Sequence, residues 1–444
     1  MILTIQSFFD EAWHDAAVVE IEKPELGHKG PSKTSYEIEY FAEHAALALA
    51  DGKTVRDLRA YSVAAPVDLD DRYANTWPAF ILDFVPQGRQ ARRIAEFMQL
   101  DPNAASTEIE LLKRSAGSPV GNLRVKEAHL LEVQRVAKMT PVGVTMQDIL
   151  SHDATFLEVA DHFSMLASGS SGLQGDWPKV ALTQSKDGLW YPAPMVEDQD
   201  ARAHVIAKLL RSAEPTDKRI LEAEAGYLKV AKDFGLNVEG ENTYGDGVLV
   251  IPRFDRLVTD QGLVRYGQES LISALGVAEF GARARHETYI KLIQDVSADP
   301  FEDTVEYILR DILNLAMGNP DNHGRNTALR KFPDGRIRLS PLFDFCPMKI
   351  DAAAIPRSTT WECMRMKNRD TNPDWREVCE AVAAPNVPAG RLMERLAAKE
   401  NLLRALPGLA AQHKVPESVV KNAIVRNIEM ADGVAALRSL PTQR

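Results

Sequence analysis

Three polar side chains between residues 318 and 344 have the types and the spacing needed for phosphoryl transfer. Asp321 and Asn326 stand five residues apart in the segment GNPDNHGRN, and Asp344 follows in PLFDF after a predicted β-hairpin. One acid can orient a substrate hydroxyl, while the amide and the second acid can hold Mg²⁺ against nucleotide phosphates. Carboxylate and amide oxygens suit this hard cation. The set therefore indicates ATP-dependent phosphoryl transfer.

The same residues admit other interpretations. Asp and Asn beside Gly or Pro are common turn residues, so an Asp-x-x-x-x-Asn spacing alone has low specificity. Asp321, His323 and Asp344 could also serve a metal-dependent hydrolase. The choice depends on the elements that carry these residues and on the rest of the chain.

Apolar patterns around the three residues predict where they lie. Apolar residues recur at helical spacing over residues 305–317, and a glycine ends the run. The turn signal PDG at residues 333–335 separates two short alternating segments, which predicts a hairpin over residues 327–343. Asp321 is therefore expected in a loop after a helix, and Asp344 just past the second strand.

Upstream segments carry residues that could bind a nucleotide. The stretch ASGSSGLQGDWPK at residues 167–179 could bring backbone N–H groups close to phosphates, although a flexible linker is the common alternative. Lys208 lies in a predicted strand at residues 204–210, and Glu224 in a predicted helix at residues 220–236. Kinases use such a lysine–glutamate pair to position ATP phosphates, whereas an exposed pair would contribute little.

Length and composition bound the architecture. A chain of 444 residues with 45% apolar and 26% charged residues is typical of a globular protein of two or three domains. We predict an α+β, two-lobed, protein-kinase-like fold. It comprises a small N-terminal α+β subdomain at residues 1–135, a kinase-like N-lobe at 136–256 and a C-lobe at 257–444 that is helical apart from the hairpin. Residues 144–163 are expected to form one amphipathic helix.

Charge and cysteine patterns restrict the environment. The net charge of −11 argues against autonomous binding of nucleic acid through a broad basic surface. The three cysteines are odd in number and lack CxxC spacing, which favours reduced thiols and argues against zinc. No apolar run approaches the ~20 residues of a membrane helix, and no signal peptide is recognised. We therefore expect a cytoplasmic protein without membrane contact.

Several motifs, in the order that a kinase requires, resemble the HipA-like serine/threonine kinases, the toxin halves of bacterial toxin–antitoxin pairs. Five matches carry this resemblance. They are an Asp-x-His-x-x-Asn loop at 321–326, a Pro-x-[Phe/Tyr]-Asp segment at 341–344, an Arg-Phe-Asp-Arg hinge at 253–256, a helix glutamate, Glu224, before AKDFGL at 231–236, and a Leu-Leu segment at 111–112 followed by Val-Gly-x-Leu at 120–123. The resemblance covers about residues 80 to 345.

The resemblance implies a kinase that uses ATP and Mg²⁺ and phosphorylates a Ser or Thr hydroxyl of a protein. Asp321, Asn326 and Asp344 would be the catalytic residues, with the last two as metal ligands, and His323 would hold the loop beside the nucleotide. The nucleotide would also meet the following residues: Lys179, Lys208 and Glu224 at the phosphates, main-chain groups of Pro252 and Phe254 at adenine, and Asp255 at the ribose.

The phosphate loop departs from the family pattern Ser-x-x-Gly-x-Gln-x-Lys. Counting back from Lys179 gives Gly175, and then Gly172 in place of the serine that the family autophosphorylates. Glycine has no hydroxyl, and Ser171 and Ser170 lie one and two residues upstream. We therefore expect these residues to line the phosphates and autophosphorylation to occur at one of the two serines.

The resemblance also suggests partners and leaves alternatives. Family members phosphorylate aminoacyl-tRNA synthetases and pair with a HipB-like DNA-binding antitoxin, so contact with nucleic acid would be indirect. One alternative is a small-molecule phosphotransferase; those enzymes usually carry His-x-Asp, whereas here His323 follows Asp321. Another is a catalytically weak kinase fold that serves as the partner of an antitoxin in a repressor complex.

Overall fold

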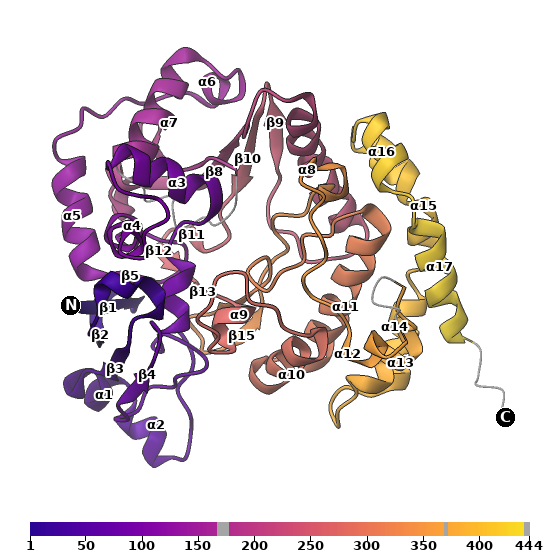
Figure 1. The fold of residues 1–444 in the computed structure, drawn as a ribbon, viewed down its shortest axis with the longest axis horizontal. Helices are drawn as coiled ribbons and strands as arrows, with labels where there is room; N and C mark the ends of the chain where they lie inside the picture. Colours follow the sequence, from indigo (N-terminus) through magenta and orange to yellow (C-terminus); the bar gives the residue numbers. More distant parts are fainter. Residues whose placement is uncertain (167–176, 368–371, 439–444) are drawn as a thin grey trace. The chain divides into compact units, whose positions relative to one another are not determined.

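The chain forms two compact units, whose elements are labelled in Figure 1. The computed structural model describes residues 1–166, 177–367 and 372–438. Unit 1 consists of Met1–Arg211, Thr243–Phe280 and Leu329–Ile337, and unit 2 of Ser212–Asn242, Gly281–Ala328 and Arg338–Arg444. Because each unit gathers distant stretches of chain, the domain boundaries expected at residues 135 and 256 stay predictions.

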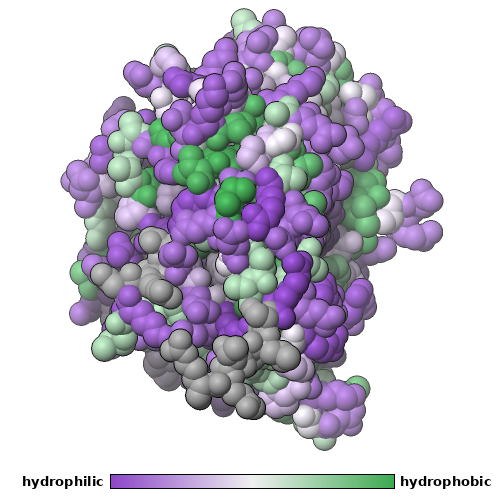
Figure 2. Space-filling model, turned by 90° about the vertical axis from the view of Figure 1, so that its right-hand side faces the viewer, coloured by the Kyte–Doolittle hydropathy of each residue, from purple (hydrophilic) through white to green (hydrophobic). Residues whose placement is uncertain are grey.

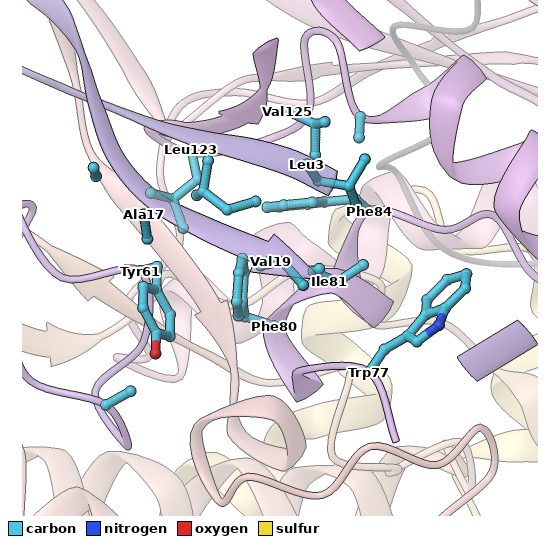
Figure 3. Packing of buried hydrophobic residues seen from close by; sticks show 14 of the residues in the cluster. Leu3, Ala17, Val19, Tyr61, Trp77, Phe80, Ile81, Phe84, Leu123 and Val125 are labelled. Atoms are coloured by element: carbon cyan, nitrogen blue, oxygen red, sulfur yellow. The ribbon is translucent and has the colours of Figure 1, made fainter. Parts of the chain in front are cut away.

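Unit 1 begins with a five-stranded antiparallel sheet of order β4-β3-β2-β1-β5. Its strands are β1 Ile2–Phe9, β2 Ala12–Ile21, β3 Ser32–Tyr36, β4 Arg72–Ala74 and β5 Leu123–Val125. Buried apolar side chains of the strands, such as Leu3, Val19 and Val125, gather with the rings of Tyr61 and Phe80 in one core (Figure 3). This core is the N-terminal α+β element that the sequence predicts.

Short helices complete this part of unit 1. They are η1 Pro24–Lys29, α1 Ile38–His44, α2 Ala46–Ala50, η2 Ala79–Asp83, α3 Gly88–Phe97, α4 Thr107–Ser115 and α5 Lys126–Val136. Figure 2 shows one face of the molecule, on which hydrophilic side chains predominate and hydrophobic ones form small groups. No helix in the described part of the chain has the length and apolar content needed to cross a membrane.

A second five-stranded sheet in unit 1 has the order β7-β6-β8-β10-β9. Its strands are β6 Lys179–Ser185, β7 Trp190–Pro192, β8 Ala201–Leu209, β9 Thr243–Gly245 and β10 Val248–Pro252, with short turns η3 Ala193–Met195 and η4 Asp198–Asp200. Alternate residues of β8, Val205 and Ala207, pack in a buried cluster with Ile149 and Phe156. Since strand side chains alternate between faces, Lys208 projects from the opposite face of the sheet.

The helices that cover this sheet correct one prediction. Residues 144–163 form two helices, α6 Met146–Leu150 and α7 Ala154–Leu166, instead of one. His152 adopts a left-handed conformation with φ 55°, which ends α6. The Asp153 side chain accepts the Thr155 N–H at 2.8 Å and starts α7.

The region after residue 256 holds strands that the sequence analysis missed. Strands β11 Arg256–Thr259 and β12 Gly262–Arg265 form a hairpin, and β13 Gly267–Ser270 precedes a single helical turn, α9 Leu271–Ala274. The expectation of a wholly helical segment was wrong here because each strand has only four residues, too few for a clear alternating pattern. The predicted hairpin exists as β14 Ala328–Lys331 and β15 Ile337–Leu339, within a sheet of order β13-β14-β15.

Unit 2 is built mainly of helices around α11, which packs against α10, α14, α15 and α17. The helices are α8 Pro215–Asp233, α10 His286–Val296, α11 Pro300–Met317, η5 Met348–Ile350, α12 Glu362–Arg365, α13 Trp375–Ala381, α14 Ala389–Ala397, α15 Glu400–Gln412, α16 Glu417–Ala423, α17 Asn427–Ala435 and η6 Ala436–Arg438. The predicted helices at 220–236 and 305–317 are confirmed as α8 and α11, and both begin five residues earlier than expected.

A glycine ends α11 where the chain turns into the Asp321 loop. Gly318 has φ 70°, a conformation that residues with a Cβ rarely adopt. A Cβ at this position would also lie 2.7 Å from the carbonyl oxygen of Ala423, too close for any other residue. The direction in which the loop leaves α11 therefore depends on this glycine.

Candidate active site

A small cavity in unit 2 brings Asp321, Asn326 and Asp344 together. Its volume is about 30 Å³, and all three side chains line it. The first two residues lie in the loop after α11, and the third follows β15. The loop and the post-strand segment that the sequence indicated thus meet at one place within a single unit.

Hydrogen bonds within the loop fix the orientation of its polar groups. The Asp321 N–H donates to Asn319 Oδ1 at 3.3 Å, and Asn319 Nδ2 donates to Asn314 Oδ1 at 2.9 Å. Asn326 Nδ2 donates to the Asp321 carbonyl oxygen at 3.0 Å. Because the amide nitrogen of Asn326 is used in this way, its Oδ1 is the atom that remains for a metal ion.

His323 makes the contacts expected of a residue that holds the loop. Its Nδ1 accepts the Arg325 N–H at 3.3 Å, so the proton of the neutral ring belongs on Nε2. Nε2 lies 3.5 Å from Asp321 Oδ1. The ring therefore lies beside the carboxylate that would orient the substrate hydroxyl.

Asp344 adopts a left-handed backbone conformation with φ 53°. Such conformations are uncommon outside glycine and often occur at functional sites. Contacts on both sides hold the residue: the Leu342 N–H donates to the Asn237 carbonyl at 2.7 Å, and the buried Phe345 ring lies 5.3 Å from the ring of Tyr227.

The donor set of the cavity fits Mg²⁺. Mg²⁺ prefers oxygen ligands and is usually held by one or two carboxylates together with substrate phosphates. The Asp344 carboxylate and Asn326 Oδ1 provide such oxygens in one cavity. Over the described ranges of the chain, no three His, Cys, Asp or Glu side chains gather as metal ligands would.

A buried polar network that the sequence analysis missed lies against the cavity. Asp311 of α11 accepts hydrogen bonds from Arg357 Nη2 at 2.6 Å and from Trp361 Nε1 at 2.9 Å. Burial alone would raise the pKa of Asp311, but the charges of Arg357 and His286 and the hydrogen bonds from Arg357 and Trp361 together lower it. Burial lowers the pKa of His286, 3.5 Å from Asp311, to about 4. An acid inside the apolar run 305–317 was the available signal, because a buried acid requires partners.

In unit 1, two lysines stand side by side on neighbouring inner strands of the second sheet. Lys179 of β6 and Lys208 of β8 are directly opposite each other in the register of the two strands. Lys208 is 1% exposed, and its Nζ lies 5.5 Å from the centre of the Trp177 ring. Directly opposite residues have Cβ atoms about 5 Å apart, so both side chains start from one place in the sheet.

Glu224 lies on α8 and is buried in unit 2. Lys208 and Glu224 thus belong to different units, and their predicted ion pair stays a prediction. Pro252 ends β10, and both Pro252 and Phe254 are partly exposed. Their predicted main-chain contacts with adenine also stay predictions.

Asp255 is engaged by its own unit. Its side chain is 2% exposed, and it accepts hydrogen bonds from Arg253 Nε at 2.8 Å and from the Gly121 N–H at 2.9 Å. Burial would raise the pKa of this carboxyl, but the charges of Arg253 and Arg256 and the hydrogen bonds from Arg253 and Gly121 together lower it. This arrangement does not favour the ribose contact expected for Asp255.

Comparisons with known proteins decide the family. Residues 171–402 match the family described as HipA-like C-terminal domain. A Sinorhizobium fredii (strain NBRC 101917 / NGR234) protein named "Putative kinase Y4mE" is 31% identical over 308 residues, which cover 66% of this chain and 68% of that protein. The chain belongs to the HipA-like family. The family expected from its motifs is therefore confirmed.

A solved structure shows that the HipA-like fold extends along the whole chain. A chain from the complex of the Shewanella oneidensis MR-1 toxin–antitoxin system HipA, HipB and its operator DNA matches with a TM-score of 0.66. The match covers 99% of this chain and 100% of that chain at 13% identity. The predicted α+β kinase-like fold is thereby confirmed.

Part of the predicted phosphate loop lies outside the described residues. Ser170, Ser171, Gly172 and Gly175 fall within residues 167–176, so their predicted roles stay predictions. Lys179, at the end of the same motif, opens β6.

Proposed function

We propose that this HipA-like chain is a kinase that transfers the γ-phosphoryl group of ATP to a Ser or Thr hydroxyl of a protein. The proposal is supported above all by the observation that Asp321, Asn326 and Asp344 line one cavity. A loop acid, a loop amide and an acid after a hairpin are the parts with which kinases orient an acceptor and hold Mg²⁺. The family assignment and the name of the related protein support a kinase-like phosphotransferase.

The three residues would share two tasks. Asp321 would accept a hydrogen bond from the acceptor hydroxyl and align its oxygen with the γ-phosphorus. Asn326 Oδ1 and the Asp344 carboxylate would hold Mg²⁺, which neutralises charge on the phosphates when bound. The hydrogen bond from Asn326 Nδ2 to the Asp321 carbonyl would keep the metal ligand and the acceptor-orienting acid in fixed relative positions.

The paired lysines of unit 1 support phosphate binding there. Lys179 and Lys208 stand directly opposite each other in neighbouring strands, and lysine is a residue with which kinases bind phosphates. Both would contact the ATP phosphates, and Glu224 would orient Lys208. Adenine would meet main-chain groups of Pro252 and Phe254. The ribose role of Asp255 has the weakest support, since its carboxylate already binds Arg253 and Gly121.

The protein partners are proposed by likeness. The solved HipA complex contains HipB and operator DNA, and a HipB-like antitoxin is accordingly the partner proposed for this chain. Aminoacyl-tRNA synthetases are the substrate class that the family resemblance suggests. We further propose autophosphorylation at Ser170 or Ser171, because the family's acceptor position is Gly172 here.

A transfer assay tests the proposal. The purified chain is incubated with γ-labelled ATP, Mg²⁺ and a cell lysate, and labelled proteins are separated, hydrolysed and examined for phosphoserine and phosphothreonine. The expected result is label on at least one lysate protein and on a peptide containing residues 168–171. The Asp321→Asn variant serves as the matched control and should give neither. Label that enters only small molecules would contradict the proposal and favour a small-molecule phosphotransferase.

A further inference from the structure

The Asp321 loop is tied to a second loop through the residue that follows Asp321. Asn322 Oδ1 accepts the N–H groups of Ser358 and Thr359, each at 3.1 Å, and Asn322 Nδ2 donates to the Thr359 carbonyl at 2.9 Å. Thr359 Oγ1 donates to the Asn322 carbonyl at 2.8 Å. Four hydrogen bonds therefore join one residue of the catalytic loop to two residues of a distant segment; we name this set the Asn322 clamp.

The clamp is protected from water on one side. Thr359 is 1% exposed, and hydrogen bonds are stronger where water cannot compete for the donors and acceptors. Loss of the Asn322 amide would leave two backbone N–H groups and one carbonyl without these partners. Such groups carry a desolvation cost when they stay buried, so the two segments would have to move to regain partners.

The segment that holds Asn322 is itself fixed to the helical frame of unit 2. Arg357 and Trp361, on either side of the clamp residues, both bind the buried carboxylate of Asp311 on α11. The His286 N–H donates to the Thr360 carbonyl at 3.2 Å, and the rings of His286 and Trp361 stack with centroids 4.4 Å apart. The clamp therefore connects Asp321 to α11 by a route other than the covalent chain.

Two other hydrogen bonds near Asp321 involve side chains of its own loop. Asn319 Oδ1 accepts the Asp321 N–H, and Asn326 Nδ2 donates to the Asp321 carbonyl. Asn319 Nδ2 in turn donates to Asn314 Oδ1 at the end of α11, so these contacts shape the loop and its junction with that helix. The Asn322 clamp differs in that it holds the loop against a separately anchored segment, and it acts one residue from the carboxylate that needs an accurate direction.

We propose that Asn322 is a positioning residue for phosphoryl transfer, and that its clamp with Ser358 and Thr359 sets the direction of the Asp321 carboxylate. The inference rests on the proposed kinase function. The clamp segment lies shortly after Asp344 in the chain. One stretch of chain therefore links the proposed metal ligand Asp344 to the loop that carries Asp321. A displacement of about 1 Å at such a site can lower a rate on the order of 100-fold.

Substitution of Asn322 by alanine tests the proposal. Asn322→Ala should lower kcat on the order of 10- to 100-fold and leave the Kd for ATP–Mg²⁺ within about twofold, since Asn326 and Asp344 are untouched. Thr359→Val should lower kcat to a smaller extent, and Thr359→Ser, which keeps the hydroxyl donor, should restore it. The matched control is Asn427→Ala, because Asn427 is a buried amide of unit 2 that donates to the carbonyls of Leu403 and Arg404.

Hydrogen exchange provides a readout that does not depend on activity. The amides of Ser358 and Thr359 should exchange slowly in the wild-type protein and faster in Asn322→Ala, while Asn427→Ala leaves them unchanged. A near-normal kcat for Asn322→Ala would overturn the positioning role, whatever the exchange rates are. An equal loss of kcat in Asn427→Ala would also overturn it, because general destabilisation would then suffice.

The proposed function and the positioning role fail in different ways. If the wild-type chain transfers no phosphate, the proposed function fails and the positioning role falls with it, while slow exchange would still identify the clamp as a structural feature. If the wild type is active and the wild-type amides of Ser358 and Thr359 exchange rapidly, the kinase function stands and the clamp is refuted.

Discussion

Two aspartates occur in motifs that mark the same family, yet the structure surrounds them differently. Asp255, in the Arg-Phe-Asp-Arg segment of unit 1, has a side chain that is 2% exposed and bound to Arg253 and to the Gly121 N–H. Asp321, in the Asp-x-His-x-x-Asn loop of unit 2, has a side chain that is 26% exposed and lines a cavity. One carboxylate is engaged by its own fold, and the other faces a space that a substrate group can enter.

This difference distinguishes Asp255, an acid that holds its neighbours in place, from Asp321, the proposed catalytic acid. A buried carboxylate that is paired and hydrogen-bonded holds its neighbours, and its removal leaves charges uncompensated. A carboxylate at a cavity acts on whatever enters, and its removal leaves the fold nearly unchanged. Stability and activity should therefore respond in opposite ways to the same substitution at the two positions.

The largest effect is expected at Asp321. Asp321→Asn should reduce phosphoryl transfer on the order of 10³-fold, about 4 kcal/mol in the barrier, because the amide cannot accept the hydroxyl proton or orient it equally well. The midpoint of urea unfolding and the Kd for ATP should stay close to those of the wild type. Transfer of labelled phosphate to a protein acceptor measures the effect.

An exposed acid of the same unit provides the control for Asp321. Asp233, on α8, contacts His413 at 2.5 Å and lies away from the cavity residues. Asp233→Asn should keep full transfer activity. Near-normal activity of Asp321→Asn would remove Asp321 from the catalytic class and end the contrast with Asp255.

The next effect concerns the stability of unit 1. Asp255→Asn should lower the free energy of unfolding by about 3 kcal/mol, because Arg253 and Arg256 would stay buried without their counter-charge. Urea unfolding measures the loss, and Asp334→Asn, at an exposed turn of the same unit, should leave the midpoint unchanged. A variant with normal stability and weaker ATP binding would restore the ribose role and place Asp255 with Asp321.

The sequence predicted the positions of Asp321 and Asp344 along the fold better than the contacts that support them. The apolar spacing of 305–317, the following glycine and the PDG turn are local signals, and they located Asp321 and Asp344 correctly in a loop and after a strand. One partner of Asp255, Gly121, is 134 residues away, and the clamp partners of Asn322 are 36 and 37 residues away. Contacts of this kind depend on tertiary packing, which single-sequence patterns do not contain.

Some predicted helix and strand boundaries were wrong for a related reason. The break between α6 and α7 rests on one left-handed residue, His152, which carries no strong turn signal. Strands β11 to β13 have four residues each, so their alternation could not be separated from helical spacing nearby. The long helices α8 and α11 were predicted well because many apolar positions repeat in each.

A third acid, Asp311, lines the cavity like Asp321 but is buried and paired like Asp255. Its partner His286 has a pKa lowered to about 4 by burial, below the ordinary value of 6.5. Between these two values the unfolded chain binds a proton that the folded chain does not, so stability falls as the pH falls below 6.5. The loss from this group should reach about 2 kcal/mol at pH 5.

Unfolding at two pH values isolates the contribution of His286. Burial also lowers the pKa of the half-buried His129 to about 4, so the wild-type curve alone is not specific. His286→Gln removes the titrating group, and its loss of stability between pH 7 and pH 5 should be smaller than that of the wild type by about 2 kcal/mol. Equal losses in both proteins would show that His286 is solvated in the folded protein. Asp311 would then not be a buried structural acid of the same kind as Asp255.

The smallest effect is expected for the metal ligands, which share the cavity with Asp321. Asn326→Ala and Asp344→Asn should each weaken ATP binding about tenfold, about 1.4 kcal/mol, when Mg²⁺ is present, and leave metal-free binding of ATP unchanged. Titration of ATP with and without Mg²⁺ measures both quantities. Asn326→Ala should also lower the transfer rate, because the Asp321 carbonyl loses its contact with Nδ2. Equal affinities of wild type and both variants for ATP–Mg²⁺ would refute metal ligation and leave Asp321 as the sole acid of the cavity with a catalytic task.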